Sequence, residues 1–152
     1  MSDKKNIKTK KLLNWLQNTI AKPQKKLDGQ AICPFLKQYL ANIQIIEVKN
    51  PKHLSTHVHT CASIMGSLGL EAIIIHGFDE KYEKLIRMAK AWNVKYAYND
   101  TTILVMHPET IDPPLPLNYN YEDPLIIIQK TSTLEKARKQ LEKNGKYYKH
   151  YK

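Results

Sequence analysis

The stretch Ala72-Ile73-Ile74-Ile75-His76-Gly77 decides how the chain is expected to fold. Four apolar residues follow one another without alternation, and three are β-branched, which is typical of a strand covered on both faces. A similar run, Leu125-Ile126-Ile127-Ile128, comes late in the chain, and Ile43–Val48 comes before the first one. We therefore expect a buried sheet built from segments that are far apart in the sequence.

Helices are expected before, between and after these strands, because apolar residues recur there at spacings of three and four. The predicted helices are Lys10–Ala21, Pro34–Asn42, His53–Leu68, Glu80–Ala91 and Leu134–Lys143. Two further strands, Val94–Tyr98 and Thr102–Met106, are predicted to form a hairpin around Asn99-Asp100. This order of elements predicts an α+β fold: a single-domain sandwich with one mixed four- or five-stranded sheet packed by helices.

The length of 152 residues suits one domain. We expect that domain to span residues 11–145, between a disordered basic tail at 1–10 and a basic, aromatic tail at 146–152. The sequence has no run of 18 apolar residues and no apolar segment of the secretory kind near its start. A cytoplasmic protein with no membrane partner is therefore expected.

The net charge of +10 is concentrated at the two ends of the chain. Residues 1–26 carry +7, residues 130–152 carry +6, and the middle carries −3. Basic ends are typical of solvated tails, and they are also typical of a surface that binds nucleic acid. In the C-terminal tail, aromatic and basic residues alternate in a way that suits stacking on bases between phosphate contacts: Lys146, Tyr147, Tyr148, Lys149 and Tyr151.

Cys33 is the first candidate for chemistry, because it directly precedes Pro34, and proline favours the first turn of a helix. A thiol at a helix N-terminus lies near unpaired backbone N–H groups, which favour the thiolate. The thiolate is what a nucleophile or a metal ligand requires, and a Cys-Pro pair can also supply a thiolate to haem iron. The alternative is a small structural residue beside Phe35. A metal or haem cofactor therefore stays open.

His76 and His107 both stand where an apolar strand ends, before Gly77 and Pro108 respectively. Open sheets usually place ligands beyond such strand ends. If the two strands run parallel, both imidazoles lie along one edge of the sheet, whereas the predicted hairpin would not require this. The alternative for either histidine is a structural role, bonded to a loop carbonyl.

A metal site is a weaker hypothesis, based on His57 and Cys61, which lie one helical turn apart. Zinc needs ligands that converge tetrahedrally, and neither C-x-x-C nor H-E-x-x-H occurs. The chain also lacks the glycine-rich phosphate loops and the G-x-S-x-G nucleophile motif. Their absence argues against nucleotide hydrolysis and dinucleotide redox chemistry.

The chain resembles a bacterial family of unknown function that is marked by a Cys-Pro-Phe motif. The resemblance covers most of residues 12–142, and the residues that carry it are Trp15-Leu16, Cys33-Pro34-Phe35, Ile75-His76, the helix Tyr82–Ala91, His107-Pro108 and Asn118-Tyr119. The chain departs from the family pattern at His76-Gly77, where many members have His-Pro, and in the proline-rich segment Pro108–Pro124. The resemblance implies no known activity, but it places Cys33, His76 and His107 at three motif positions.

Two functions follow as hypotheses. The first is a small cytoplasmic enzyme acting on a small molecule, with Cys33 as nucleophile or ligand and His76 or His107 as acid and base. It predicts Cys33 within about 10 Å of one histidine, beside a cavity covered by the Pro108–Pro124 loop. The second is a module that binds RNA through its Lys/Tyr-rich ends. The oligomeric state and the reaction are not predicted.

Overall fold

The structure, a computed structural model, describes residues 3–27, 31, 33, 36, 40–65, 67–110 and 121–144. The chain divides into two compact units, which are described separately. Unit 1 comprises Met1–Ala41, Ile111–Tyr119 and Lys136–Lys152, and unit 2 comprises Asn42–Thr110 and Asn120–Glu135.

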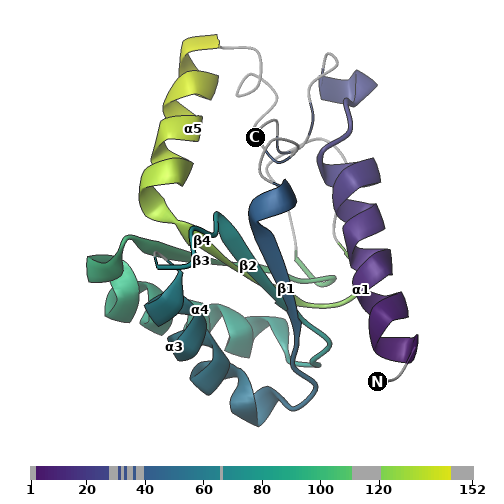
Figure 1. The fold of residues 1–152 in the computed structure, drawn as a ribbon, viewed down its shortest axis with the longest axis vertical. Helices are drawn as coiled ribbons and strands as arrows, with labels where there is room; N and C mark the ends of the chain where they lie inside the picture. Colours follow the sequence, from purple (N-terminus) through teal and green to yellow (C-terminus); the bar gives the residue numbers. More distant parts are fainter. Residues whose placement is uncertain are drawn as a thin grey trace. The chain divides into compact units, whose positions relative to one another are not determined.

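Unit 2 contains a four-stranded mixed sheet. Its strands are β1 (Ile43–Glu47), β2 (Ala72–His76), β3 (Thr101–Met106) and β4 (Leu125–Lys130), and they lie in the order β1-β2-β4-β3 (Figure 1). β1 and β2 are parallel, whereas β4 is antiparallel to both β2 and β3. All five residues of β2 are buried, as its continuous apolar run predicted. The predicted fold class, α+β with one mixed sheet packed by helices, is confirmed.

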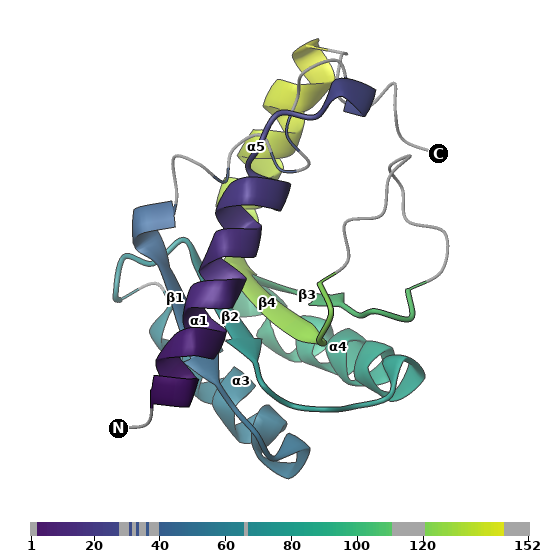
Figure 2. The same ribbon diagram turned by 90° about the vertical axis from the view of Figure 1, so that its right-hand side faces the viewer.

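Helices α3 (Leu54–Ile64) and α4 (Tyr82–Tyr96) cover one face of this sheet (Figure 2). Leu54, Val58 and Cys61 of α3 and Leu85, Ala89 and Trp92 of α4 recur at helical spacing and are buried. They pack in one core with residues from alternate positions of the central strands: Ile73, Ile75, Ile103, Ile126 and Ile128. Because side chains alternate along a strand, the intervening residues of these strands belong to the opposite face.

The predicted hairpin around Asn99-Asp100 is wrong. Helix α4 continues to Tyr96, a short 3-10 turn η5 (Ala97–Asn99) follows, and Asp100 adopts a left-handed conformation with φ 52°. The pattern was ambiguous because Tyr96 continues the buried helical stripe of Leu85, Ala89 and Trp92. Tyr96 is 3% exposed, whereas Val94 is 82% exposed, as expected for a helix with one buried side.

Unit 1 contains a longer first helix than the sequence predicted. Helix α1 (Asp3–Trp15) continues into a π-helical turn η1 (Leu16–Ile20), and a short 3-10 turn η2 (Lys25–Leu27) follows. Leu12, Leu16 and Ile20 form the buried stripe that was expected. The described residues of the predicted disordered tail, from Asp3 onward, are helical, since lysine is a good helix former and the segment contains neither glycine nor proline.

The remaining elements are short turns and one C-terminal helix. The 3-10 turn η3 (Leu40–Asn42) leads into β1, and η4 (Pro51–His53) leads into α3. Helix α5 (Thr131–Asn144) begins where Asp100 accepts a hydrogen bond from the backbone N–H of Ser132 at 2.9 Å. Most of the predicted helix Pro34–Asn42 lies outside the described residues. Of the helices that the structure describes, none has the length and apolar character needed to cross a membrane.

Candidate active site at the carboxyl edge of the sheet

The sheet topology places the ends of three strands at one edge. Because β2 and β3 are both antiparallel to β4, they run in the same direction as each other and as β1. His76 ends β2, and His107 directly follows Met106, the last residue of β3. The two histidines therefore share an edge of the sheet, the arrangement expected for parallel strands.

The two histidines nevertheless belong to opposite faces of the sheet. Ile75 and Val105 face the helix-covered core, so His76 lies on the other face, whereas His107 returns to the helix side. The ring of His107 lies 5.6 Å from the ring of Tyr82, the first residue of α4. Strand β4 also separates β2 from β3, so the two backbones are about 10 Å apart by strand spacing alone. The geometry supports separate roles for the two residues.

His76 has a carboxylate as its neighbour on the sheet. Glu47, the last residue of β1, is the register partner of His76, and both residues belong to the face opposite α3 and α4. His76 is 3% exposed, and the side chain of Glu47 is also 3% exposed. The Oε1 atom of Glu47 lies 3.8 Å from Nζ of the exposed Lys49. Its buried Oε2 atom accepts no hydrogen bond from any residue that the structure describes.

Gly77 allows the Glu47 side chain to occupy this position. The φ angle of Gly77 is +93°, a conformation that residues with a Cβ rarely adopt. A Cβ at position 77 would lie 2.7 Å from Cγ of Glu47, closer than any stable contact. The strand end is thus shaped so that a carboxylate lies over the backbone that follows His76.

His107 is held by two backbone groups. Its Nδ1 accepts a hydrogen bond from the N–H of Glu109 at 3.0 Å, which leaves Nε2 as the protonated nitrogen, and this donates to the carbonyl of Glu80 at 2.8 Å. Both ring nitrogens are therefore occupied in a ring that is 5% exposed. This arrangement supports the structural alternative for His107, an anchor between the loop after β3 and the segment before α4.

The carboxylate of Glu80 is stabilised in its charged form. The backbone N–H of Lys81 donates to Oε1 at 2.9 Å, and this hydrogen bond is the main cause that holds the pKa of Glu80 below its usual value. Nζ of Lys84 lies 3.3 Å from Oε2 and adds to the effect. The carboxylate therefore stabilises the segment just before α4.

Cys33 is an exposed thiol in unit 1. Its backbone N–H donates to the carbonyl of Ile20 at 3.0 Å, and its carbonyl accepts from the N–H of Leu36 at 3.2 Å. Pro34 and Phe35 lie outside the described residues. Because Cys33 and the two histidines belong to different units, the predicted distance of about 10 Å between them stays a prediction.

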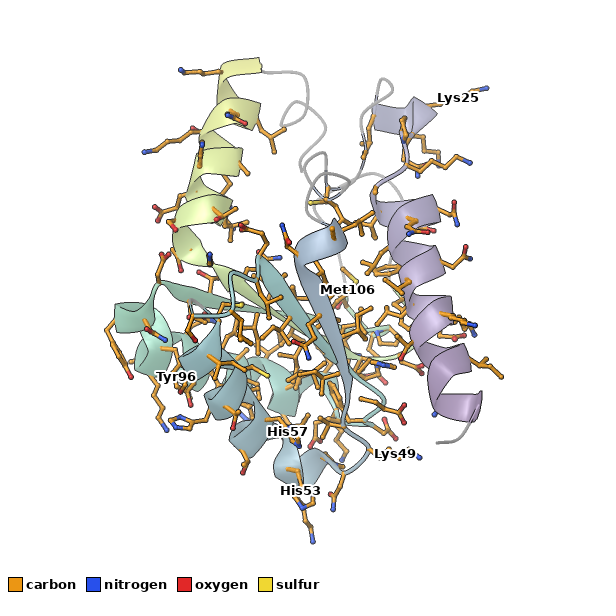
Figure 3. The ribbon with its side chains drawn as sticks, viewed as in Figure 1. Lys25, Lys49, His53, His57, Tyr96 and Met106 are labelled. Carbon is orange, nitrogen blue, oxygen red and sulfur yellow. The ribbon has the colours of Figure 1, made fainter. Side chains whose placement is uncertain are left out.

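The metal hypothesis gains no support from the described residues. Cys61 belongs to α3 and is 2% exposed, on the side of the helix that faces the core. Burial raises the pKa of its thiol, which disfavours the thiolate that a metal requires. The neighbouring His59 bonds through Nδ1 to the hydroxyl of Tyr96 at 2.9 Å, and His57 lies nearer the start of α3 (Figure 3). Within the described ranges, no three His, Cys, Asp or Glu side chains gather in a way that could hold a metal ion.

Two other predicted features fall on residues that the structure does not describe. The tail with Lys146, Tyr147, Tyr148, Lys149 and Tyr151 lies outside the described ranges, as do residues 111–120 of the Pro108–Pro124 loop. Their predicted roles stay predictions.

Sequence reasoning missed Glu47. The run Ile43–Val48 was predicted only as a strand, with no role for Glu47, whereas the side chain of this residue is buried. The available signal was its place: like His76, it is the last residue of a strand that precedes a chain-turning segment, here Asn50-Pro51.

No protein-family model matches the chain, and neither the curated proteins nor the solved structures compared with it give a match. The resemblance to the Cys-Pro-Phe family consequently stays a prediction.

Proposed function

We propose that the chain is an enzyme acting on a small molecule, in which His76 transfers protons and the thiol of Cys33 is the nucleophile. The observation that supports this proposal is the pairing of two buried polar residues, Glu47 and His76, at the carboxyl ends of adjacent parallel strands. A carboxylate and an imidazole at adjacent strand ends, where open sheets usually place ligands, favour a functional site.

Within this proposal Glu47 acts on His76 and not on the substrate. A carboxylate beside an imidazole can orient the ring, which suits a group that accepts a proton from a thiol and returns it to a leaving group. His107 is assigned a structural role because both of its nitrogens are occupied. We assign the enzyme to the cytoplasm, where thiols such as Cys33 and Cys61 stay reduced.

The proposal is tested by the reactivity of Cys33 towards iodoacetamide. If His76 activates the thiol, the alkylation rate of Cys33 at pH 7 falls about tenfold or more in His76→Asn. His53→Asn is the matched control, because His53 is an exposed histidine on η4 and its loss leaves the rate unchanged. Each rate is measured by peptide mass spectrometry, with circular dichroism to verify the fold.

Cys61 provides an internal reference in the same experiment, since burial raises its pKa and slows its alkylation in the native protein. An equal Cys33 rate in wild type and His76→Asn, or a Cys61 that reacts faster than Cys33, would contradict the proposal. Turnover is then sought by mass spectrometry of a protein-free metabolite extract. We expect a compound that wild type consumes and that both His76→Asn and Cys33→Ser leave intact.

A further inference from the structure

The division into two units coincides with a division of charge. Unit 1 holds 16 of the 24 Lys and Arg residues and 4 of the 14 Asp and Glu residues, a net charge of +12. Unit 2 holds the remaining 8 basic and 10 acidic residues, a net charge of −2. Two basic ends of the sequence, far apart along the chain, therefore belong to one compact unit, and the unit with Glu47 and His76 is mildly acidic.

Helix α1 contributes one part of this basic unit. Lys8, Lys10 and Lys11 are exposed, and η2 adds the exposed Lys25, whose side chain extends away from the ribbon (Figure 3). The apolar stripe of the same segment, Leu12, Leu16 and Ile20, is at most 6% exposed. The helix therefore presents cations to a partner, while its apolar residues are used for packing.

The C-terminal part of α5 contributes the other part. Lys136, Lys139 and Lys143 follow one another at spacings of three and four, so they share one face of the helix. All three are exposed, and Arg138 is exposed beside them. The only acidic residue in the sequence of positions 136–144 is Glu142.

Two kinds of anionic partner suit a lysine-rich unit, and the structure favours one. A helix that binds a membrane surface needs an exposed apolar face to enter the lipid. In α1 that stripe is buried, and Ile7, at 62%, is the one strongly exposed large apolar residue among those described there. A phosphate backbone needs only the cations, and the three tyrosines between lysines in residues 146–152 suit stacking on unpaired bases.

We propose that unit 1 binds single-stranded nucleic acid, a function separate from the proposed chemistry of Cys33 and His76. The exposed lysines of α1 and α5 contact phosphates, and the tyrosines of residues 146–152 stack on bases. This proposal does not depend on the enzyme proposal: it concerns different residues, and either can fail alone.

The test compares two variants of the full chain that lose the same charge. In the unit 1 variant, Lys8, Lys10, Lys139 and Lys143 are replaced by Gln; in the control, the exposed Lys52, Lys81, Arg87 and Lys90 of unit 2 are replaced by Gln. Gln preserves helix propensity, so both variants are expected to fold. Binding of a fluorescent single-stranded RNA of about 20 nucleotides is measured by anisotropy between about 50 and 200 mM NaCl, a range over which phosphate contacts weaken strongly.

We expect wild type and the unit 2 control to bind alike, and the unit 1 variant to bind at least about tenfold more weakly. The slope of the logarithm of its binding constant against the logarithm of the salt concentration should also become shallower, by about 0.7 for each lysine–phosphate interaction that the substitutions remove. Deletion of residues 146–152 should remove most of the affinity. Tighter binding to the single strand than to a duplex of the same length supports the stacking role of the tyrosines.

Three outcomes would overturn the proposal. Equal weakening in both charge variants would mean that net charge alone attracts the RNA. Binding without salt dependence would exclude phosphate contacts. Binding to vesicles that contain phosphatidylserine, without binding to RNA, would identify a membrane surface as the partner.

Discussion

Gly77 and Glu47 lie in contact because glycine has no Cβ and tolerates a positive φ. Position 77 has a φ of +93°, and the space that a Cβ would occupy is taken by Cγ of Glu47. The positive φ disfavours any side chain at position 77, whereas the lack of space there depends on one neighbour, Glu47. The two contributions to the cost of a substitution at position 77 can therefore be separated by mutation.

Gly77→Ala should lower the free energy of unfolding by about 1–3 kcal/mol, the combined effect of backbone strain and of the clash with Glu47. In a Glu47→Ala background the clash is absent, so the same substitution should cost less. Gly69→Ala is the matched control: Gly69 has a φ of +65° but nothing within 4 Å of its Cβ position, so it carries the strain alone. The measurement is urea unfolding of these variants, with Gly77→Ala and Glu47→Ala combined in a double-mutant cycle.

Equal costs of Gly77→Ala with and without Glu47 would contradict the close packing of these two residues. The cycle also separates stability from the proposed chemistry. Glu47→Gln keeps the volume of the side chain and changes its charge, so it should alter the alkylation rate of Cys33 more than it alters the unfolding midpoint.

At the scale of elements, helix α4 closes the open edge of the sheet through one side chain. Asn93 accepts a hydrogen bond from the N–H of Ile103 at 2.7 Å and donates to the carbonyl of the same residue at 2.9 Å. Ile103 belongs to β3, which is the last strand in the order β1-β2-β4-β3. The amide thus takes the place of a neighbouring strand at that point, which protects an edge that would otherwise expose unpaired backbone groups.

Asn93→Ala should lower the free energy of unfolding by about 1–3 kcal/mol, because two backbone groups of Ile103 lose their partner. Val94→Ala is the control in the adjacent position, where the side chain is 82% exposed and the expected change is below about 0.5 kcal/mol. Thermal and urea unfolding provide the measurement. A large cost at Val94 with none at Asn93 would favour the strand that the sequence predicted at Val94–Tyr98 over the end of α4.

At the scale of the whole molecule, the charge separation has a consequence for stability. Sixteen cations and four anions in unit 1 repel one another on balance, whereas the charges of unit 2 nearly cancel. Salt screens such repulsion, since the Debye length falls from about 30 Å at 0.01 M to about 10 Å at 0.1 M. The two units should therefore respond differently to ionic strength.

Hydrogen exchange should show this difference. Between about 20 and 300 mM NaCl, amides of α1 should exchange more slowly at the higher salt, while amides of β2 and β4, in the core of unit 2, should change little. Mass spectrometry of peptides from the two segments in one sample supplies the internal control. A uniform change across both units, or faster exchange of α1 at high salt, would contradict a role for repulsion in unit 1.

The sequence predicted those features that a local pattern encodes. The apolar runs at residues 73–75 and 126–128 identified the central strands, and the spacing of Leu12, Leu16 and Ile20 identified the first helical segment, because burial imposes a period on a strand or a helix. The prediction failed at Val94–Tyr98, where a short segment fits both periods and only the packing of Tyr96 decides between them.

For the candidate site, the sequence alone determined that His76 and His107 stand at strand ends. The tertiary structure decided that Glu47 is the neighbour of His76, that His76 and His107 belong to opposite faces, and that His107 has both nitrogens bonded to backbone. The physical reason is that strand order and register arise from pairing between distant segments. Such pairing is favoured by the burial of the whole sheet, and no single segment contains the information that specifies its partner.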